Sequence, residues 1–387
     1  MASIREFIRV FRSLTEEEKR RLACVEERLD KSENAYLKKL LKLKRVKLIE
    51  KTINLLYKKI LYIHLDIISE AHKEQIDKLN KKIWDKEKQM ILDDLKKNAY
   101  DLLPSYIAPN IVGLDPVKQA AVLQLFSKEG LHILLLGDPG TGKTDILRSL
   151  NDLSPIATMG LGSGTSGAGL AVTTQGNTIM KGLLPLADQG IACIDELNLM
   201  EKKDAASLYN AMEKSFVSYD KGGKHFKFDA RVRVIATANP KGDSFKGDKF
   251  DQLKSQMPFD SALMSRFHLV FIIRRPDEKK LRLISERILK GVKTKLNEEI
   301  ISLVKEYLSD VKDIDPVIPA ELSKEITDFV AWLKKDESRL LVEISPRTVL
   351  GFMRLAKASA RMEMRDKVIK SDIKRVKQLF LDSLEVI

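Results

Sequence analysis

Residues 133–144, which read ILLLGDPGTGKT, are the feature that most constrains what this chain can fold into. Four apolar residues run into a glycine-rich turn, and the spacing Gly137-x4-Gly142-Lys143-Thr144 is that of a phosphate-binding P-loop. The apolar run is typical of a parallel strand that is covered on both faces. A strand before the turn and a helix after it predict a nucleoside-triphosphate site in an α/β domain.

Each residue type in this turn answers a need of a bound triphosphate. Glycines let backbone N–H groups surround an anion without interference from Cβ atoms, and the following helix points its positive end at the same phosphates. We expect Lys143 to reach the β- and γ-phosphates of ATP, and the hydroxyl of Thr144 to bind Mg2+. The predicted nucleotide-binding residues are Gly137, Asp138, Pro139, Gly140, Thr141, Gly142, Lys143 and Thr144.

Two further apolar runs end in polar residues that suit the same reaction. The run at residues 191–200 contains Asp195 and Glu196. After a P-loop, such a pair predicts an aspartate that holds Mg2+ with Thr144 and a glutamate that orients and deprotonates the attacking water. Asn239 ends the next apolar run, where it either polarises the water beside the γ-phosphate or caps a turn.

Basic residues stand at two other positions of interest. Arg266 precedes an apolar strand, and it is either a structural ion pair or a finger that reaches a neighbouring subunit's phosphate. Residues 215–238 predict a hairpin followed by a buried strand. Three lysines cluster near the tip of this hairpin: Lys221, Lys224 and Lys227. The glycine- and serine-rich residues 160–169 lie inside the domain, which favours a functional loop over a linker.

The first hundred residues have a different sequence pattern, which is typical of helices. No proline or glycine interrupts residues 3–103, and apolar residues step by three and four from Val46 to Ile67, so we expect helices that pack as a small bundle or as an oligomerising coiled coil. Residues 31–60 hold ten Lys or Arg and two Glu, within a chain of net charge +13. This basic block suits either a polyanion such as nucleic acid, or a solvated helix face or an acidic partner.

Three regions follow from these patterns. We expect a helical, basic region over residues 1–103, an α/β core with a parallel sheet over 104–275, and a helical lid over the nucleotide at 276–387, with Arg347 near the start of its long helix. Cys24 and Cys193 are too few for a four-cysteine zinc site or a disulfide framework. We expect no membrane segment and a cytoplasmic protein, since no apolar run is long enough to span a bilayer.

Seven segments, in this order, resemble the ATPase of the minichromosome maintenance (MCM) replicative helicases, which belong to the AAA+ class. They are IAPNIVGLDPVKQAAVLQLF (107–126), GDPGTGK (137–143), GSGTSGAGL (162–170), LPLADQGIACIDE (184–196), ARVRVIATANP (230–240), LMSRFHLVF (263–271) and ISPRTVLGFMRLAKASARM (344–362). The resemblance runs from about residue 85 to the C-terminus.

The resemblance implies a role for each matching position. Lys143 and Thr144 match Walker A, Asp195 and Glu196 match Walker B, and Asn239 matches sensor 1. Arg266 matches the arginine finger, which acts on nucleotide in the neighbouring subunit, and Arg347 matches sensor 2. The stretch 162–169 looks like the helix-2 insert, and Lys221 falls on the DNA-contacting lysine of the presensor hairpin. We expect Lys224 and Lys227 on the same hairpin to contact DNA as well. A homo-oligomeric, hexameric ring on single-stranded or forked DNA follows by analogy.

Departures from the family pattern keep more than one function open. Residues 1–84 resemble neither an OB-fold nor a zinc-binding subdomain, and His268 stands where the family usually has Asp. The first hypothesis is an ATP-driven DNA translocase or helicase in DNA replication. The second is an MCM-like remodeller or loading factor that binds a replication protein through residues 1–84 without unwinding DNA. The third, a paralogue that hydrolyses ATP poorly, is disfavoured by the complete set of site residues.

Overall fold

The computed structural model describes residues 88–383, apart from 90, 164–166, 176–177, 202–203, 222–223, 243, 248–249, 290–297, 336 and 338–342. The chain divides into two compact units, Met1–Ile91 and Leu92–Ile387, and the second is described below. The predicted helical region with its apolar seam and basic block lies almost wholly outside the described residues, so it stays a prediction. No helix in the described part of the chain is long and apolar enough to cross a membrane.

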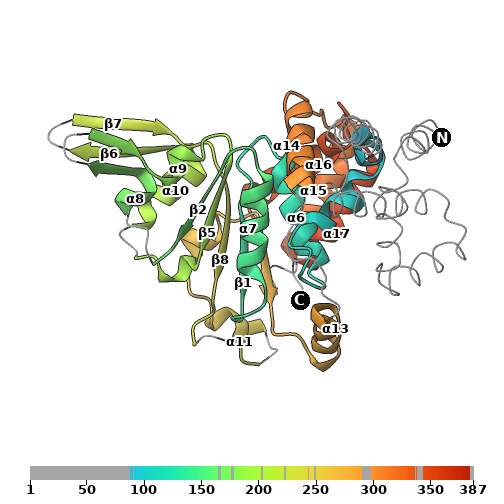
Figure 1. The fold of residues 1–387 in the computed structure, drawn as a ribbon, viewed down its shortest axis with the longest axis horizontal. Helices are drawn as coiled ribbons and strands as arrows, with labels where there is room; N and C mark the ends of the chain where they lie inside the picture. The colour runs from blue at the N-terminus through green and yellow to red at the C-terminus, as the bar shows by residue number, and fades with distance from the viewer. Residues whose placement is uncertain are drawn as a thin grey trace, which may run out of the picture. The chain divides into compact units, whose positions relative to one another are not determined.

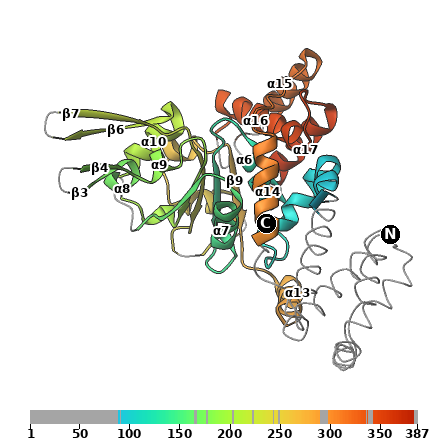
Figure 2. The ribbon, with the colours of Figure 1, turned by 45° about the horizontal axis from the view of Figure 1, so that its top comes forward.

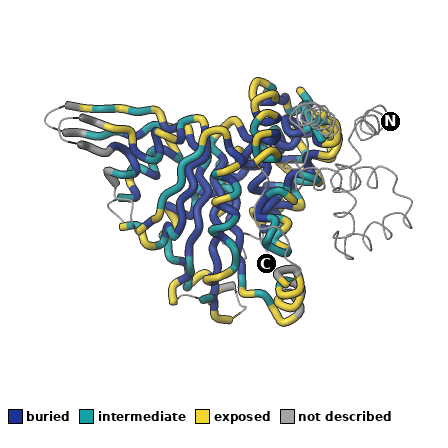
Figure 3. The backbone as a smooth tube through the Cα atoms, viewed as in Figure 1, coloured by how far each residue is buried: buried dark blue, intermediate teal, exposed yellow. Residues whose placement is uncertain are grey.

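A five-stranded parallel sheet forms the centre of this unit (Figure 1). Its strands are β1 (Ile133–Gly137), β2 (Ala157–Leu161), β5 (Ile191–Asp195), β8 (Arg233–Ala238) and β9 (Leu269–Ile273), in the order β2-β5-β8-β1-β9. Every residue of β1, β5 and β9 is buried, as the tube in Figure 3 shows for the middle of the molecule. The predicted α/β class is confirmed, because the apolar runs are those of strands covered on both faces.

Helices cover the sheet, and the helices that follow β9 in the chain form the helical lid. Besides the sheet strands, the elements are η2 (Leu103–Tyr106), α6 (Asp115–Phe126), α7 (Lys143–Leu153), α8 (Gly167–Ala171), β3 (Val172–Gln175), β4 (Thr178–Lys181), α9 (Leu183–Leu186), η3 (Leu197–Leu199), α10 (Ala205–Lys214), β6 (Phe216–Lys221), β7 (Lys224–Asp229), α11 (Phe250–Ser255), α12 (Ser261–Met264), α13 (Glu278–Leu289), α14 (Glu298–Asp310), α15 (Ala320–Lys335), α16 (Pro346–Met362) and α17 (Lys370–Asp382).

Two antiparallel hairpins project from the side of the sheet away from the lid helices (Figure 2). The predicted hairpin is confirmed as β6–β7, in which Lys221 pairs with Lys224. The second hairpin, β3–β4, was not predicted. The resemblance of residues 162–169 to the helix-2 insert stays a prediction; in the structure Gly167 begins α8, and the strands of this hairpin follow at 172–181. Its signal was present in the sequence, since Gly-Asn separates the runs VTTQ and TIMK.

Helix α16 joins the lid to the sheet-covering helix α6. Ser345 caps its first turn, with a side-chain oxygen that accepts from the N–H of Arg347, and Pro346 starts the helix. At its other end, the buried Arg361 donates to the carbonyls of Phe126 and Ile314. On its outer side, α16 packs against α15 and α17 through stacked and tilted rings of Phe329, Phe352 and Phe380. The lid therefore rests on α6 through a fixed contact.

Two histidines lie at the same junction, of which His132 is buried and His268 is partly buried. Nδ1 of His132 accepts from the N–H of Val234 at 3.1 Å, so its Nε2 donates to the carbonyl of Met212. Nδ1 of His268 accepts from the N–H of His132, and its Nε2 lies 3.1 Å from Nη1 of Arg354 on α16. His268, the departure from the family pattern, therefore contacts the lid of its own chain.

The lowered pKa values of these histidines lead us to expect that the folded chain loses stability in mild acid. Burial lowers the pKa of His132 to about 3 and the pKa of His268 well below its usual value. The unfolded chain takes up protons below about pH 6.5 that the folded chain does not, so the free energy of unfolding falls as pH drops through this window. At pH 5 the loss for His132 is about 2 kcal/mol.

Denaturant unfolding of the parent and of His132→Gln at pH 7.5 and pH 5 tests this. Glutamine retains an acceptor and a donor but does not titrate. We therefore expect His132→Gln to lose less stability between the two pH values than the parent. Equal losses in the two proteins would show that His132 does not contribute to acid sensitivity.

Candidate functional site

Three adjacent strands end at one edge of the sheet, and each carries part of the predicted site. The P-loop follows β1, Asp195 is the last residue of β5, and Asn239 follows β8, which lies between them. The strands are parallel, so their carboxyl ends share this edge. The structure thus brings together the P-loop, the two carboxylates and Asn239, which come from distant parts of the sequence.

The P-loop turn depends on its glycines. Gly140 and Gly142 have φ angles of 77° and 83°, which favour glycine, and Gly142 leads into α7, whose first residue is Lys143. A Cβ atom at Gly137 would lie 2.1 Å from the carbonyl oxygen of Ile273 on β9. Glycine is therefore needed both for the direction of the turn and for the close approach of two strands.

Lys143 is buried within the loop. Its Nζ donates to the carbonyls of Gly137 and Asp138, each at 2.7 Å. Burial lowers the pKa of Lys143 to about 8, and the nearby carboxylates of Asp138, Asp195 and Glu196 act in the opposite direction. The ammonium group therefore lies among the backbone groups that would surround a phosphate.

The side chain of Asp138 has a structural task that the motif alone does not reveal. One carboxylate oxygen accepts from the N–H of Phe245 at 2.8 Å, and the other accepts from the N–H of Arg275 at 3.1 Å. These residues follow β8 and β9, so a single carboxylate ties the P-loop to two neighbouring segments. Asp138 therefore fixes the position of the loop.

A chain of hydroxyl and carboxylate groups connects the P-loop to the end of β5. The hydroxyl of Thr144 donates to Oδ1 of Asp195 at 3.3 Å. The buried hydroxyl of Thr237 donates to the same oxygen and accepts from the N–H of Glu196 at 2.9 Å. Sequence reasoning missed Thr237, whose signal is a hydroxyl among the apolar residues at the end of the strand RVIATA.

Glu196 has a backbone conformation that few residues adopt. Its φ and ψ are 54° and 45°, which is the left-handed region that usually favours glycine or asparagine. The backbone of Glu196 also passes Gly162 closely, since a Cβ atom there would lie 2.2 Å from the carbonyl oxygen of Glu196. Strained backbone of this kind is concentrated at functional sites, which fits the predicted role of Glu196.

Arg266 lies at the amino ends of the parallel strands, which is the edge of the sheet opposite to the P-loop. It comes just before β9, whose first residue, Leu269, pairs with Ile133 at the start of β1. The P-loop follows the end of β1, about 15 Å further along the strands. Within the chain, Nη2 of Arg266 pairs with Glu213 at 2.8 Å and the guanidinium lies over the ring of Tyr209.

The structure places Arg347, and with it the start of the lid helix α16, elsewhere than expected. The sequence predicted that it begins over the nucleotide, but Nη2 of Arg347 donates to Glu213 at 2.9 Å and Nη1 lies 3.4 Å from the hydroxyl of Ser265. Arg347 therefore lies with Arg266 and away from the P-loop of its own chain. The reason is the packing of α16 on α6, which the local sequence does not show.

The β6–β7 hairpin carries the lysines that were predicted to contact DNA. Lys221 and Lys224 are the paired residues of the two strands that flank the loop at 222–223. Lys227 lies further from the loop, and its Nζ is 4.1 Å from the centre of the Phe216 ring. The backbone thus places Lys221 and Lys224 closer to the tip of the hairpin than Lys227.

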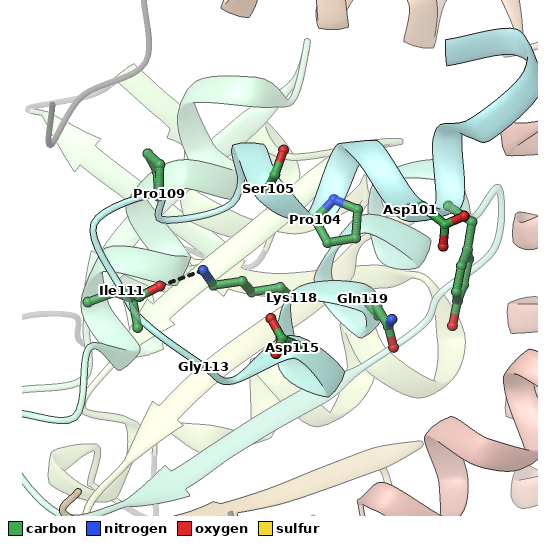
Figure 4. A pocket seen from close by; sticks show the side chains of 10 residues that line it. Asp101, Pro104, Ser105, Pro109, Ile111, Gly113, Asp115, Lys118 and Gln119 are labelled. Atoms are coloured by element: carbon green, nitrogen blue, oxygen red, sulfur yellow. Dashed lines mark hydrogen bonds between the residues drawn. The ribbon is translucent and has the colours of Figure 1, made fainter. Parts of the chain in front are cut away.

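A polar pocket of about 310 Å³ lies next to the segment that precedes the P-loop (Figure 4). Lys118 crosses it and donates to the carbonyls of Ala108 and Ile111. Ile111 also packs on the P-loop, since a Cβ atom at Gly142 would lie 2.7 Å from its Cδ1. The segment that forms one wall of this pocket is therefore in contact with the P-loop.

Comparisons with known proteins identify the family. The model of the MCM P-loop domain matches residues 87–292, and that of the MCM AAA-lid domain matches residues 302–384. The minichromosome maintenance protein MCM of Saccharolobus solfataricus is 31% identical over 336 residues, which are 80% of this chain and 49% of that protein. DNA replication licensing factor MCM4 of Arabidopsis thaliana is 32% identical over 321 residues, or 75% of this chain and 38% of that protein.

The matched part of the chain thus spans about half the length of the first of these relatives, and less of the second. The two family models cover the described sheet and the lid helices in the order in which the structure contains them. This chain belongs to the MCM family.

Proposed function

We propose that the chain is an ATP-driven DNA translocase or helicase of the MCM type, which acts in DNA replication and hydrolyses ATP at the subunit interfaces of a homo-oligomeric, hexameric ring. The observation that carries this proposal is the division of the predicted catalytic groups between two edges of one sheet. The P-loop, Asp195, Glu196 and Asn239 are at one edge, and Arg266 and Arg347 are at the other. A ring places the two edges of neighbouring subunits against each other.

At the first edge, the residues fit MgATP. Backbone N–H groups of the P-loop and the start of α7 would bind the phosphates, with Lys143 as the nearby cation. Thr144 and Asp195 offer hard oxygen ligands 3.3 Å apart, which suit Mg2+ together with phosphate oxygens and water. Mg2+ would neutralise charge that develops on the phosphates. Glu196 would take the proton of the attacking water, and Asn239 would orient that water.

At the second edge, Arg266 and Arg347 would act on the nucleotide of the neighbouring subunit. Their guanidinium groups are too far from the P-loop of their own chain, because β1 and β9 separate the two edges. An arginine supplied in trans stabilises charge in the transition state of phosphoryl transfer. This division of labour makes hydrolysis depend on assembly.

DNA binding is the part of the proposal that separates it from the alternative, an MCM-like remodeller or loading factor. In the helicase, the β6–β7 hairpin presents Lys221 to backbone phosphates, and residues 31–60 add further positive charge. In the remodeller, residues 1–84 bind a replication protein and DNA does not drive turnover.

We therefore expect Lys221→Ala to lose the stimulation of ATP hydrolysis by single-stranded DNA while its basal hydrolysis remains. Lys221 lies on the hairpin and not at the nucleotide edge, so the phosphate site is left intact. The measurement is the ATPase rate with and without single-stranded DNA, together with unwinding of a forked duplex. The matched control is Lys335→Ala, an exposed lysine at the end of α15. Full DNA stimulation in Lys221→Ala would contradict the helicase and favour the remodeller.

A further inference from the structure

We propose that Glu213 is a positioning residue that holds Arg266 and Arg347 as a pair, so that both reach the phosphates of a neighbouring subunit together. This inference rests on the proposed function and adds a residue that sequence reasoning did not select. In the sequence, Glu213 is one more charged residue in the amphipathic helix α10. In the structure, its carboxylate joins two arginines that lie far apart along the chain.

The geometry of the pair is specific. Oε2 of Glu213 accepts from Nη2 of Arg266 at 2.8 Å, and Oε1 accepts from Nη2 of Arg347 at 2.9 Å. Each arginine thus has its own carboxylate oxygen. Charge-assisted hydrogen bonds at these distances are stronger than neutral ones, and they fix direction as well as distance.

Helix α10 supplies a second contact to Arg266. Tyr209 is four residues before Glu213, so the two side chains share one face of the helix. The guanidinium of Arg266 lies over the Tyr209 ring, with its Cζ 4.7 Å from the ring centre. Arg266 is therefore held by a ring on one side and by a carboxylate at its tip, which is a more defined position than a single surface ion pair provides.

The carboxylate also reduces the electrostatic repulsion between the two arginines. Two guanidinium groups close together repel each other, and a negative charge between them offsets that repulsion. Arg266 comes from the turn before β9, whereas Arg347 comes from the first turn of the lid helix α16. Glu213 therefore connects the core to the lid at the edge where the neighbouring nucleotide would lie.

The cluster is open enough to meet a ligand. The side chains of Glu213 and Arg347 are 42% and 39% exposed, so incoming phosphate oxygens have access to the same guanidinium groups. Arg266 is more enclosed, at 17% exposed, which suits a side chain with a fixed direction. Because both arginines donate to the same carboxylate, they would contact the phosphates of the neighbouring subunit together.

The test compares Glu213→Ala and Glu213→Gln with the parent chain, and uses Asp328→Ala as a control that removes an exposed carboxylate from α15. We expect Glu213→Ala to lower kcat for ATP by about 100-fold, the cost of a catalytic group displaced by about 1 Å, while KM for ATP changes little. Glu213→Gln should fall between the two, since its amide oxygen still accepts from one arginine but its NH2 group cannot accept from the other. Thermal unfolding checks that each variant folds.

Mixed oligomers show whether the effect is one of position. Glu213 serves the nucleotide of the neighbour, so adding Lys143→Ala subunits, which retain Glu213, should restore part of the activity of Glu213→Ala. Loss of activity without recovery, in subunits that co-assemble, would show a general structural defect instead. Hydrolysis by Glu213→Gln at or above the parent rate would also overturn the proposal, because a carboxylate that accepts from both arginines would then not be needed for activity.

Arg266→Ala in the same assay separates this inference from the proposed function. If Arg266→Ala hydrolyses ATP at the parent rate, Arg266 does not act on the neighbouring subunit's nucleotide, and this part of the proposed function is wrong. If Arg266→Ala is inactive but Glu213→Ala is as active as Asp328→Ala, the positioning role is wrong and the proposed function stands.

Discussion

Replacing Arg266 by alanine is expected to lower ATP hydrolysis by about 10³–10⁵-fold, the contribution that an arginine finger usually makes. ATP binding should persist, because Arg266 lies at the edge of the sheet opposite to the P-loop. The measurements are the binding of a fluorescent ATP analogue and the steady-state ATPase rate. Arg282→Ala, which removes an exposed arginine from α13, is the matched control.

Mixing two inactive variants tests whether Arg266 acts across an interface. Arg266→Ala retains the P-loop, and Lys143→Ala retains the arginine, so one kind of mixed interface has both groups. Even a few repaired interfaces should be measurable when the lost factor is this large. If the two variants co-assemble and activity does not recover, Arg266 does not act in trans.

The nucleotide edge could be predicted from the sequence because its information is local. The P-loop spacing fixes a strand, a turn and a helix, and the carboxylates of Asp195 and Glu196 directly follow an apolar run. Once the strands are parallel, their carboxyl ends must share an edge. Thr237 was missed, because a hydroxyl in a buried strand becomes informative only when the oxygen of Asp195 lies beside it.

The arginine edge could not be predicted in this way. The position of Arg347 depends on the packing of α16 on α6, which involves contacts such as Arg361 with the carbonyl of Phe126. A helical lid looks the same in sequence whether it begins over the P-loop or at the other edge. Glu213 was missed for a related reason, since an exposed glutamate on an amphipathic helix usually faces solvent.

Glu196→Gln is expected to bind ATP as the parent does and to hydrolyse it about 10²–10⁴-fold more slowly, which is the usual contribution of a general base. Glutamine has nearly the same shape, and the backbone of residue 196 is held by the hydroxyl of Thr237, so the left-handed conformation should be retained. The amide cannot accept the proton of the attacking water, and only the chemical step is lost.

Lys143→Ala gives the contrasting result, because it removes a buried cation beside the P-loop carbonyls and should abolish tight ATP binding itself. Both variants and the parent are compared by the binding of an ATP analogue and by the rate of single-turnover hydrolysis. Hydrolysis by Glu196→Gln at the parent rate would show that another group takes the proton. In that case Glu196 would be a structural residue, whose unusual backbone serves the approach of Gly162 rather than catalysis.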